Sequence, residues 1–488
     1  MIDLTVNEEK LERTAKRCRE RSIIIPTFSQ LENPTSIPNK IKEQLRQTGL
    51  WDIAPQNLFR ITWKNEPTAK GGLFRTTPNY VELPPELTGV EARIIALVGK
   101  WFPTGSHKVG ASFGCLVPPL VTGQFDPTVN KAVWPSTGNF CRGGAYDATL
   151  LGCESIAILP EQMSKERFQW LRSVAGEIIA TPGSESNVKE IYDKVWDLKQ
   201  TRKDIFVFNQ FAEFGNYLFH YEVTGHAIEE VVRNEIGRGQ FRGVCFTTGS
   251  AGTIASGDYL KQAYPNSKIA AGEALQCPTL LSNGYGAHRI EGIGDKHVPW
   301  IHNVRNTDLV IAIDDEAAMN LLRLFNEPAG RDYLMNEIGV PVEIISKLDL
   351  LGISSIANVL MAIKFAKYFE LTREDLILTV FTDSTELYQS RLQEMRARRG
   401  EYSVQHAIRD FAQHLMAVKT DSMLELAHPD RRRIHNLKYF TWIEQQKFDL
   451  NELNRQWYDH ERYWREIQKL TPKIDELISQ FNEKVGLT

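Results

Sequence analysis

The stretch that decides the fold is ARIIALVGKWFPTGSHKVGA, residues 92–111. An apolar run of strand character ends near Gly99, a short polar loop follows, and a helix is expected to begin close to Lys108. The same order recurs along the chain, with helical stretches of roughly 10 to 20 residues between the strands. The later strand-like runs are KAVWPS, SIAILP, IFVFN, GVCFTTG, SKIAAGE, DLVIAI and LILTVFT. This alternation predicts an α/β fold with mostly parallel sheets covered by helices.

The length of 488 residues exceeds what one compact core holds, so two packed domains with additions at both ends are expected. Residues 1–85 are predicted to form an extension of short helices. A smaller α/β domain is expected over 86–215 and a larger one over 216–398, each with a mostly parallel twisted sheet flanked by helices. Residues 399–488 are predicted to be a helical extension, whose Trp and Tyr stripe docks onto the protein's own body or onto a sister subunit.

Composition narrows the function classes. Hydrophobic residues make up 42% of the chain, charged residues 24%, and the formal net charge is -4. This balance favours neither nucleic acid nor an anionic membrane as a partner. The charged amino terminus has no apolar signal-peptide core, and a cytoplasmic protein is expected. The six cysteines form no Cys-x-x-Cys pair and the histidines lack close ligand spacing, so reduced thiols and no metal site are expected.

Two loops at predicted strand ends carry groups for covalent chemistry and carboxylate binding. Such loops meet at one edge of a parallel sheet. Lys108, in PTGSHKVGA, could form an imine with an aldehyde cofactor, although a lone lysine at a helix start is usually a surface charge. The turn from Ser136 to Phe140 offers several hydrogen-bond donors and a helix N-terminus to a carboxylate. A simple helix cap is its alternative reading.

Two further loops suit a phosphate and an aromatic nitrogen. The small residues from Thr247 to Ala255 could wrap a tetrahedral anion, or merely allow helix and strand to pack closely. They lack the lysine of a nucleoside triphosphate loop and the glycine spacing of a dinucleotide fold. The stretch from Phe381 to Tyr388 places a polar side chain where it could meet a ring nitrogen, or is an ordinary loop with a helix cap.

Together and in this order, the four loops resemble those of the fold-type II pyridoxal-phosphate enzymes, the superfamily of cysteine synthase, threonine synthase and tryptophan synthase beta subunit. The resemblance covers Tyr80 to Leu392, and the stretches Glu291–Gly294 and Gly352–Asn358 agree with it. It implies that pyridoxal 5'-phosphate is held as a Schiff base on Lys108, the catalytic residue. The cofactor-binding residues that it implies are Lys108, His107, Asn139, Gly249, Ser250, Ala251, Gly252, Thr253 and Ser384. The substrate-binding residues that it implies are Ser136, Thr137, Gly138, Asn139 and Phe140.

The resemblance also implies a reaction on a small amino acid, by β-elimination or β-replacement through an aminoacrylate. Ser384 at the pyridine nitrogen would favour this route, since a hydroxyl does not hold that nitrogen protonated. A homodimer is expected, with an additional small subunit as an option.

Both ends extend beyond minimal cysteine synthases. The long form, with its lead-in from Phe59 to Pro67, resembles pyridoxal-phosphate proteins labelled only as a beta subunit and the larger subunit of 2-amino-4-oxopentanoate thiolase. That thiolase, which transfers an acyl group to coenzyme A, is therefore the alternative activity. A regulatory subunit with a vestigial site is a third reading.

Three other features have open roles. Glu273 and Asp295 lie near predicted strand ends and are candidates for a function. The Arg431 to Arg433 cluster is expected to be solvated or paired with carboxylates, with recognition of a phosphorylated cofactor such as coenzyme A as the alternative.

Overall fold

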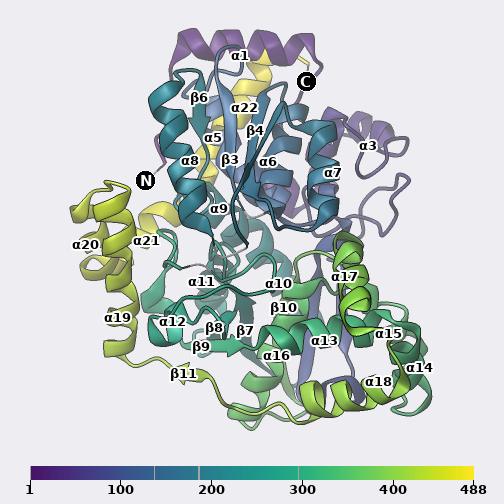
Figure 1. Cartoon of the computed structure of the whole chain (residues 1–488). Coiled ribbons are helices and arrows are strands. Elements are labelled where there is room, and N and C mark those ends of the chain that lie inside the picture. Colours follow the sequence, from purple (N-terminus) through teal and green to yellow (C-terminus); the bar gives the residue numbers. More distant parts are fainter. Residues whose placement is uncertain (1, 137, 185–186, 295, 488) are drawn as a thin grey trace.

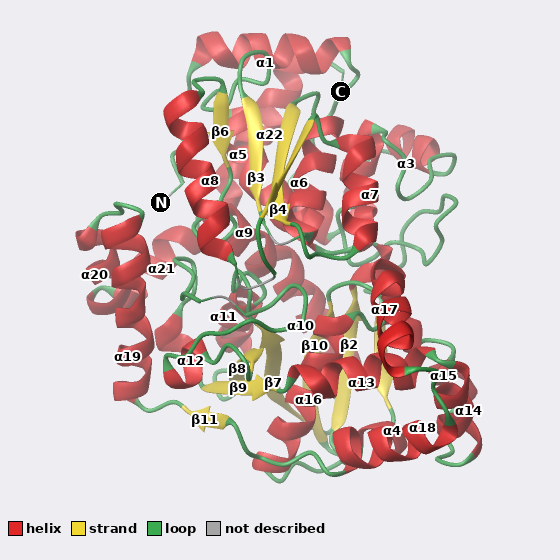
Figure 2. Cartoon of the chain, viewed as in Figure 1, coloured by secondary structure: helices red, strands yellow, loops and turns green. Residues whose placement is uncertain are grey.

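The smaller of two sheets has four parallel strands in the order β5-β4-β3-β6. This computed structural model describes residues 2–136, 138–184, 187–294 and 296–487. The two sheets lie one above the other, each with helices around it (Figure 1, Figure 2). The strands of the smaller sheet are β3 (Lys131–Pro135), β4 (Glu154–Pro160), β5 (Glu177–Thr181) and β6 (Ile205–Val207).

The larger sheet has seven strands in the order β1-β2-β10-β7-β8-β9-β11. The five inner strands run parallel, and β1 and β11 pair antiparallel at the two edges. The predicted α/β fold is therefore confirmed. The strands are β1 (Tyr80–Leu83), β2 (Arg93–Val98), β7 (Gln240–Thr247), β8 (Lys268–Ala274), β9 (Leu309–Ile313), β10 (Asp375–Phe381) and β11 (Met423–Glu425).

The division into four domains remains a prediction, but three strands do not follow it. Strand β1 falls within the predicted extension 1–85, yet it pairs with β2 in the larger sheet. Strand β2 falls within 86–215, yet it pairs with β10 in the larger sheet. Strand β11 falls within the helical carboxyl-terminal extension, yet it pairs with β9. For β2 and β11 this hydrogen-bonding partner lies far away in the sequence.

Alternating residues of β3 explain why the smaller sheet is covered on both faces. Val133 packs with Ile191 and Val195 of α8 (Val188–Thr201). Ala132 and Trp134 point to the opposite face, where the core includes α5 and α6. A Cβ atom on Gly144 would lie 2.1 Å from the Trp134 ring, so only glycine lets α6 approach this closely. The helices on this side are α5 (Lys108–Val121), α6 (Asn139–Leu150) and α7 (Lys165–Val174).

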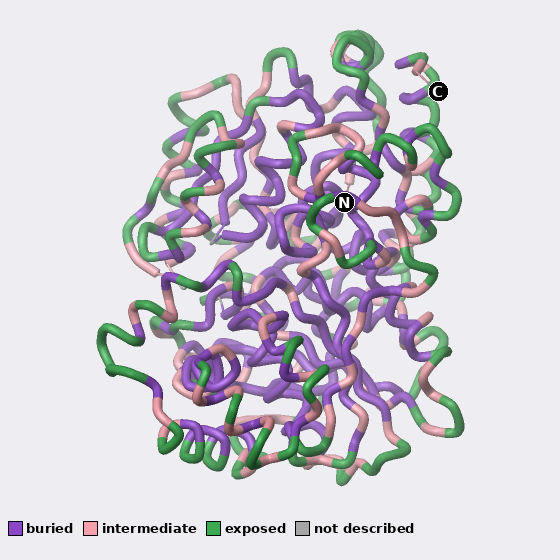
Figure 3. The backbone as a smooth tube through the Cα atoms, turned by 90° about the vertical axis from the view of Figure 1, so that its right-hand side faces the viewer, coloured by how far each residue is buried: buried purple, intermediate pink, exposed green. Residues whose placement is uncertain are grey.

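The larger sheet is buried in the same way. Along β2, Ile94 packs in the core with α13 and α16, whereas Ile95 packs in the core that includes α10 and α11. Buried segments fill the middle of both halves in Figure 3. The helices around this sheet are α9 (Phe214–Phe219), α10 (Gly225–Glu235), α11 (Ile254–Ala263), α12 (Thr279–Ser282), α13 (Asp315–Asn326), α14 (Pro328–Asn336), α15 (Val342–Ile345), α16 (Ile353–Tyr368) and α17 (Gln389–Arg399).

The two extensions pack on the body of the protein and on each other. Helix α22 lies against α1 and α5, so the first and last helices of the chain pack together beside the smaller sheet (Figure 1). The Trp442 indole donates a hydrogen bond of 2.8 Å to the Val298 carbonyl, and the Trp464 ring lies 5.3 Å from that of Tyr217. Docking of the aromatic stripe onto the protein's own body is thus confirmed. The helices are α1 (Glu8–Glu20), α2 (Phe28–Glu32), α3 (Asn39–Leu45), α4 (Pro85–Thr88), α18 (Val404–Phe411), α19 (His428–Lys438), α20 (Leu450–Tyr458), α21 (His460–Gln468) and α22 (Thr471–Val485).

The cysteines are interior residues. All six are buried and free. In the part of the chain that the structure describes, no helix has both the length and the apolar character needed to cross a membrane.

The contact between the two extensions generates a stability prediction. The buried Asn482 side chain of α22 accepts a hydrogen bond from the Ile25 amide (3.0 Å) and donates one to the Ile25 carbonyl (2.8 Å). Because Asn482→Ala leaves both backbone groups unpaired, we expect the free energy of unfolding to fall by about 2–3 kcal/mol, measured by chemical denaturation. Asn454→Ala, at an exposed position of α20, should change it by less than about 0.5 kcal/mol. Equal effects of the two substitutions would contradict the role of Asn482.

Candidate active site

Lys108 is the first residue of α5, and the loop before it is held beside the end of β10. The His107 amide donates to the Thr382 carbonyl at 3.4 Å. Gly105 has φ +72°, and a Cβ atom there would lie 2.7 Å from the Trp51 ring, so this turn requires glycine. The Lys108 ammonium nitrogen lies 2.9 Å from the Ser250 hydroxyl oxygen. Two loops predicted separately from the sequence therefore meet at the lysine.

The loop from Gly249 to Thr253 connects β7 to α11 and has the features of an anion cradle. Among the described residues, the backbone N–H groups of Gly249 to Gly252 find no hydrogen-bond acceptor. They lie directly before the N-terminus of α11, whose dipole favours an anion. Asn216 donates to the Ser250 hydroxyl at 3.0 Å, and a Cβ atom on Gly252 would lie 2.2 Å from the Asn216 side-chain oxygen. The cradle is therefore braced from behind by α9.

Asn139 joins the smaller sheet to the larger one. It begins α6 directly after the loop that follows β3, and its side-chain nitrogen donates to the Asp383 carboxylate at 2.6 Å. The Asn139 side-chain oxygen is buried and has no hydrogen-bond partner in the described structure. Ser384, next to Asp383 at the end of β10, is buried. The second and fourth predicted loops therefore also meet.

A buried chain of polar groups continues from Asp383. The Tyr388 hydroxyl donates to the Asp383 carboxylate at 2.7 Å, and Arg167 donates to the Tyr388 oxygen at 3.0 Å. Arg167 also pairs with Glu291 at 3.4 Å. Burial raises the pKa of Asp383, and the nearby Arg167 opposes that shift. Sequence reasoning missed Arg167, which α7 contributes from the other sheet.

The loop from Ser136 to Phe140, called the carboxylate loop below, contains Ser136, whose hydrogen-bond partner was also missed by sequence reasoning. Gln210 follows β6, and its side-chain amide donates to the Ser136 hydroxyl at 3.1 Å. The sequence signal for Gln210 was its position directly after the strand IFVFN. That strand, β6, pairs with β3, which leads into the carboxylate loop. The Ser136 hydroxyl also accepts from the Gly138 amide at 3.2 Å. Thr137 lies outside the described residues.

The side chain of Phe140 lies in the hydrophobic core. It is 1% exposed, and its ring packs edge-on against Trp134 at 5.4 Å. The loop from Ser136 to Phe140 thus offers backbone groups and polar side chains at its start, and an apolar anchor at its end.

His107 is buried between aromatic rings. Its ring lies 5.5 Å from Trp63 and 5.0 Å from His220. Burial, with a smaller contribution from the Lys108 charge, lowers the pKa of His107 to about 3. The imidazole is therefore neutral at ordinary pH.

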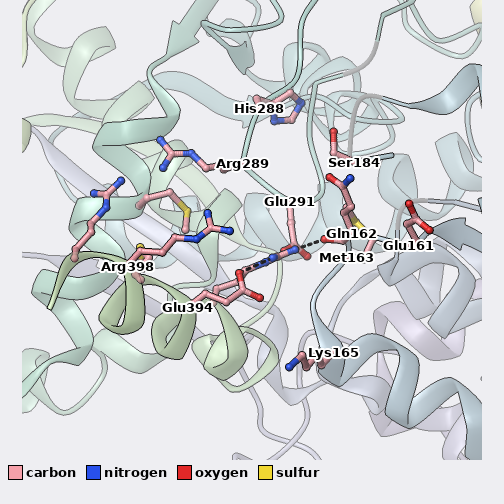
Figure 4. Close-up of a pocket in the computed structure, with 14 residues that line it drawn as sticks. Glu161, Gln162, Met163, Lys165, Ser184, His288, Arg289, Glu291, Glu394 and Arg398 are labelled. Carbon is pink, nitrogen blue, oxygen red and sulfur yellow. Dashed lines mark hydrogen bonds and ion pairs between the residues drawn. The ribbon is translucent and has the colours of Figure 1, made fainter. Parts of the chain in front are cut away.

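A cavity of about 470 Å³ opens beside this arrangement. Figure 4 shows Gln162 and Met163 on one side of it and Arg289 and Arg398 on the other, with Glu291 between them. Glu291 belongs to both the cavity and the buried chain from Asp383. The cavity therefore adjoins the candidate site.

Comparison with known proteins agrees with this geometry. The family model described as "Pyridoxal-phosphate dependent enzyme" matches residues 100–331. A cysteine synthase of Staphylococcus aureus is 30% identical over 289 residues, which make up 59% of this chain and 84% of the relative. The chain belongs to this family of pyridoxal-phosphate-dependent enzymes. A cystathionine beta-synthase of Saccharomyces cerevisiae is 25% identical over 322 residues, 62% of this chain and 58% of the relative.

Solved structures share the fold. A hydrogen sulfide-producing enzyme of Fusobacterium nucleatum gives a TM-score of 0.55 at 24% identity, over 64% of this chain and 96% of that chain. An O-acetylserine dependent cystathionine beta-synthase of Helicobacter pylori gives 0.52 at 23% identity, over 64% and 94%. The two-sheet architecture is thus that of fold-type II pyridoxal-phosphate enzymes.

The described residues fit pyridoxal phosphate. Lys108 offers an amine for the aldehyde carbon, and the unpaired amides of Gly249 to Gly252 suit the phosphate. The unpartnered Asn139 oxygen and the hydroxyl of Ser384 lie at the junction of the same loops. The four loops can therefore surround one cofactor.

The remaining candidates have structural contacts. The Glu273 carboxylate accepts from the Leu280 and Leu281 amides at 2.8 and 2.9 Å and so caps α12. In the arginine cluster, Arg431 donates to the Thr307 carbonyl at 2.7 Å and Arg433 to that of Leu280 at 2.7 Å. Asp295 lies outside the described residues. Those residues contain no group of His, Cys, Asp or Glu side chains placed to hold a metal ion.

The bridge through Tyr388 can be tested directly. Tyr388→Phe removes the hydroxyl between Asp383 and Arg167, so we expect the free energy of unfolding to fall by about 2 kcal/mol. Pyridoxal phosphate should also bind more weakly, because Asp383, which positions Asn139, loses one of the hydrogen bonds that fix it. Denaturation and a titration followed by cofactor absorbance measure the two effects. Tyr402→Phe, which removes a similarly buried hydroxyl bonded to Asp410 at 2.9 Å, should reduce stability alone. Unchanged cofactor affinity in Tyr388→Phe would argue against the bridge.

Proposed function

We propose that this pyridoxal-phosphate-dependent enzyme acts on a small amino acid by β-elimination or β-replacement, with Lys108 as the catalytic residue. The observation that carries the proposal is the position of the Lys108 amine. Lys108 begins α5, and its amine lies 2.9 Å from the Ser250 hydroxyl in the phosphate loop, residues 249–253. An amine held there can bond to the cofactor's aldehyde carbon and, once displaced, accept a proton from the substrate Cα. The activities named for the two sequence relatives, cysteine synthase and cystathionine beta-synthase, support this reaction class.

The other residues position the substrate. Pyridoxal phosphate, when bound, withdraws electrons from the substrate Cα and so makes its proton acidic. Ser136, Gln210 and the N-terminus of α6 can bind the substrate carboxylate, because they present donors and a positive helix end together. Ser384, placed at the pyridine nitrogen as the resemblance implies, would not keep that nitrogen protonated and would thus favour loss of a β leaving group.

The assembly and location of the enzyme are part of the same proposal. We propose a cytoplasmic homodimer, in line with the resemblance of the four loops to the fold-type II family. Size-exclusion chromatography with light scattering measures the mass of the assembly, and a mass above twice the chain would indicate an additional subunit.

The role of Lys108 has a spectroscopic test. Holoenzyme should absorb near roughly 410–430 nm, as expected for the cofactor held on a lysine. Lys108→Ala should lose that band and the activity. Lys131→Ala, which removes a surface lysine paired with Glu154 at 2.7 Å, should keep both. Retention of the band by Lys108→Ala would overturn the assignment.

The reaction class has a separate test. Holoenzyme given O-acetylserine with sulfide should form cysteine if it catalyses replacement, and O-acetylserine alone should yield pyruvate, ammonia and acetate if it catalyses elimination. Acyl transfer from 2-amino-4-oxopentanoate to coenzyme A, with no turnover of O-acetylserine, would instead favour the thiolase alternative.

A further inference from the structure

The cavity beside the candidate site shares walls with it. The Gly294 amide donates to the Thr248 carbonyl at 2.8 Å, and a Cβ atom on Gly249 would lie 2.8 Å from the Gly292 carbonyl oxygen. The loop that carries Glu291 therefore lies directly on the phosphate loop. A group in the cavity is thus separated from the cofactor cradle by only this loop.

The opposite wall touches the carboxylate loop. Met163 lines the cavity, and its sulfur lies 3.8 Å from the Arg167 guanidinium. That guanidinium also covers the carboxylate loop, because a Cβ atom on Gly138 would lie 2.1 Å from it. The cavity therefore adjoins both the place expected for the substrate and the place expected for the cofactor.

The cavity is larger than a sulfide ion or a water molecule needs. Its volume is about 470 Å³, whereas a water molecule occupies about 30 Å³ in the liquid. Sites for small organic ligands span roughly 300–1,000 Å³. Met163, Met319 and Met395 give the walls adaptable apolar surface. The space is thus suited to a reactant with an organic part beyond its reacting atom.

Its charged groups favour an anion. Arg391 pairs with Glu291 at 2.6 Å and with Glu394 at 2.8 Å, and Arg167 also pairs with Glu291 at 3.4 Å, so two cations balance these two lining carboxylates. Within the described ranges, Arg398 and Lys165 line the cavity and have no carboxylate partner. Glu161 also lines it and has no cationic partner in those ranges. A bound carboxylate or phosphate would therefore find two uncompensated cations and one uncompensated acid.

Most of the basic lining comes from α17. Arg391, Arg398 and Arg399 project from this helix into the cavity lining, while the matched family region ends at residue 331. These three arginines therefore lie outside the matched region, whereas Lys165 and Arg289 of the same lining lie inside it.

We propose that this cavity binds the anionic end, a carboxylate or a phosphate, of a reactant whose other end reaches past the loop of Glu291 to the cofactor site. The proposal rests on the proposed function for the identity of that site. The anion belongs either to the leaving group of the amino-acid substrate or to the nucleophile that replaces it. In both cases Arg398 and Lys165 act as specificity residues, since they are free to pair with it.

The first test measures anion binding without turnover. Inorganic pyrophosphate is titrated into holoenzyme by isothermal calorimetry, with the cofactor already filling the phosphate loop. The double substitution Lys165→Gln and Arg398→Gln should weaken its binding about tenfold or more and leave the cofactor absorbance unchanged. Arg396→Gln removes a cation from the same helix, but Arg396 pairs with Glu327 at 2.6 Å and does not line the cavity. It should bind pyrophosphate like the unmodified chain.

The second test identifies which reactant carries the anion. If the donor carries it, the double variant should have a raised KM for O-phosphoserine and an unchanged KM for O-acetylserine. If the nucleophile carries it, the KM should rise for mercaptosuccinate and stay unchanged for 2-mercaptoethanol. Equal pyrophosphate affinity in the double variant and the unmodified chain would overturn the cavity proposal. Loss of pyrophosphate binding without turnover of any donor would retain it and instead contradict the proposed reaction.

Discussion

The hydrogen bond from the Asn139 amide to the Asp383 carboxylate joins the two sheets where their carboxyl ends meet. Asn139 follows a strand of the smaller sheet, and Asp383 follows one of the larger. Both side chains are buried, so water does not compete for this contact, and breaking it would leave a buried carboxylate short of a donor. The relative positions of the carboxylate loop and of Ser384 depend on it.

The parallel strands and the convergence of the four loops could be predicted from local patterns. An unbroken apolar run such as LILTVF is typical of a strand buried on both faces, and loops at the ends of parallel strands gather at one edge. The partner of a strand is not a local property. For this reason β2 was expected with the smaller sheet although it pairs with β10, and the short strand β11 was not expected at all.

The missed parts of the site have the same cause. Arg167 sits in the stretch KERFQWLR, which has the pattern of a surface helix, and only the approach of Tyr388 and Glu291 from the other sheet buries it. The direction of Phe140 depends on where α6 begins. Because Asn139 is already helical, the next side chain is directed toward Trp134 of β3. Such long-range contacts leave little trace in the sequence nearby.

The carboxyl-terminal extension spans the whole molecule. Strand β11 is fixed to the edge of the larger sheet, and α22, farther along the chain, is fixed to α1 and α5 beside the smaller one. The segment between them, α19 to α21, is also held along its length, because Trp442 donates to the Val298 carbonyl and Trp464 packs on Tyr217. If the two sheets with their helices move apart around a reactant, this connecting segment limits the opening. A hinge-like rotation is then the easier motion.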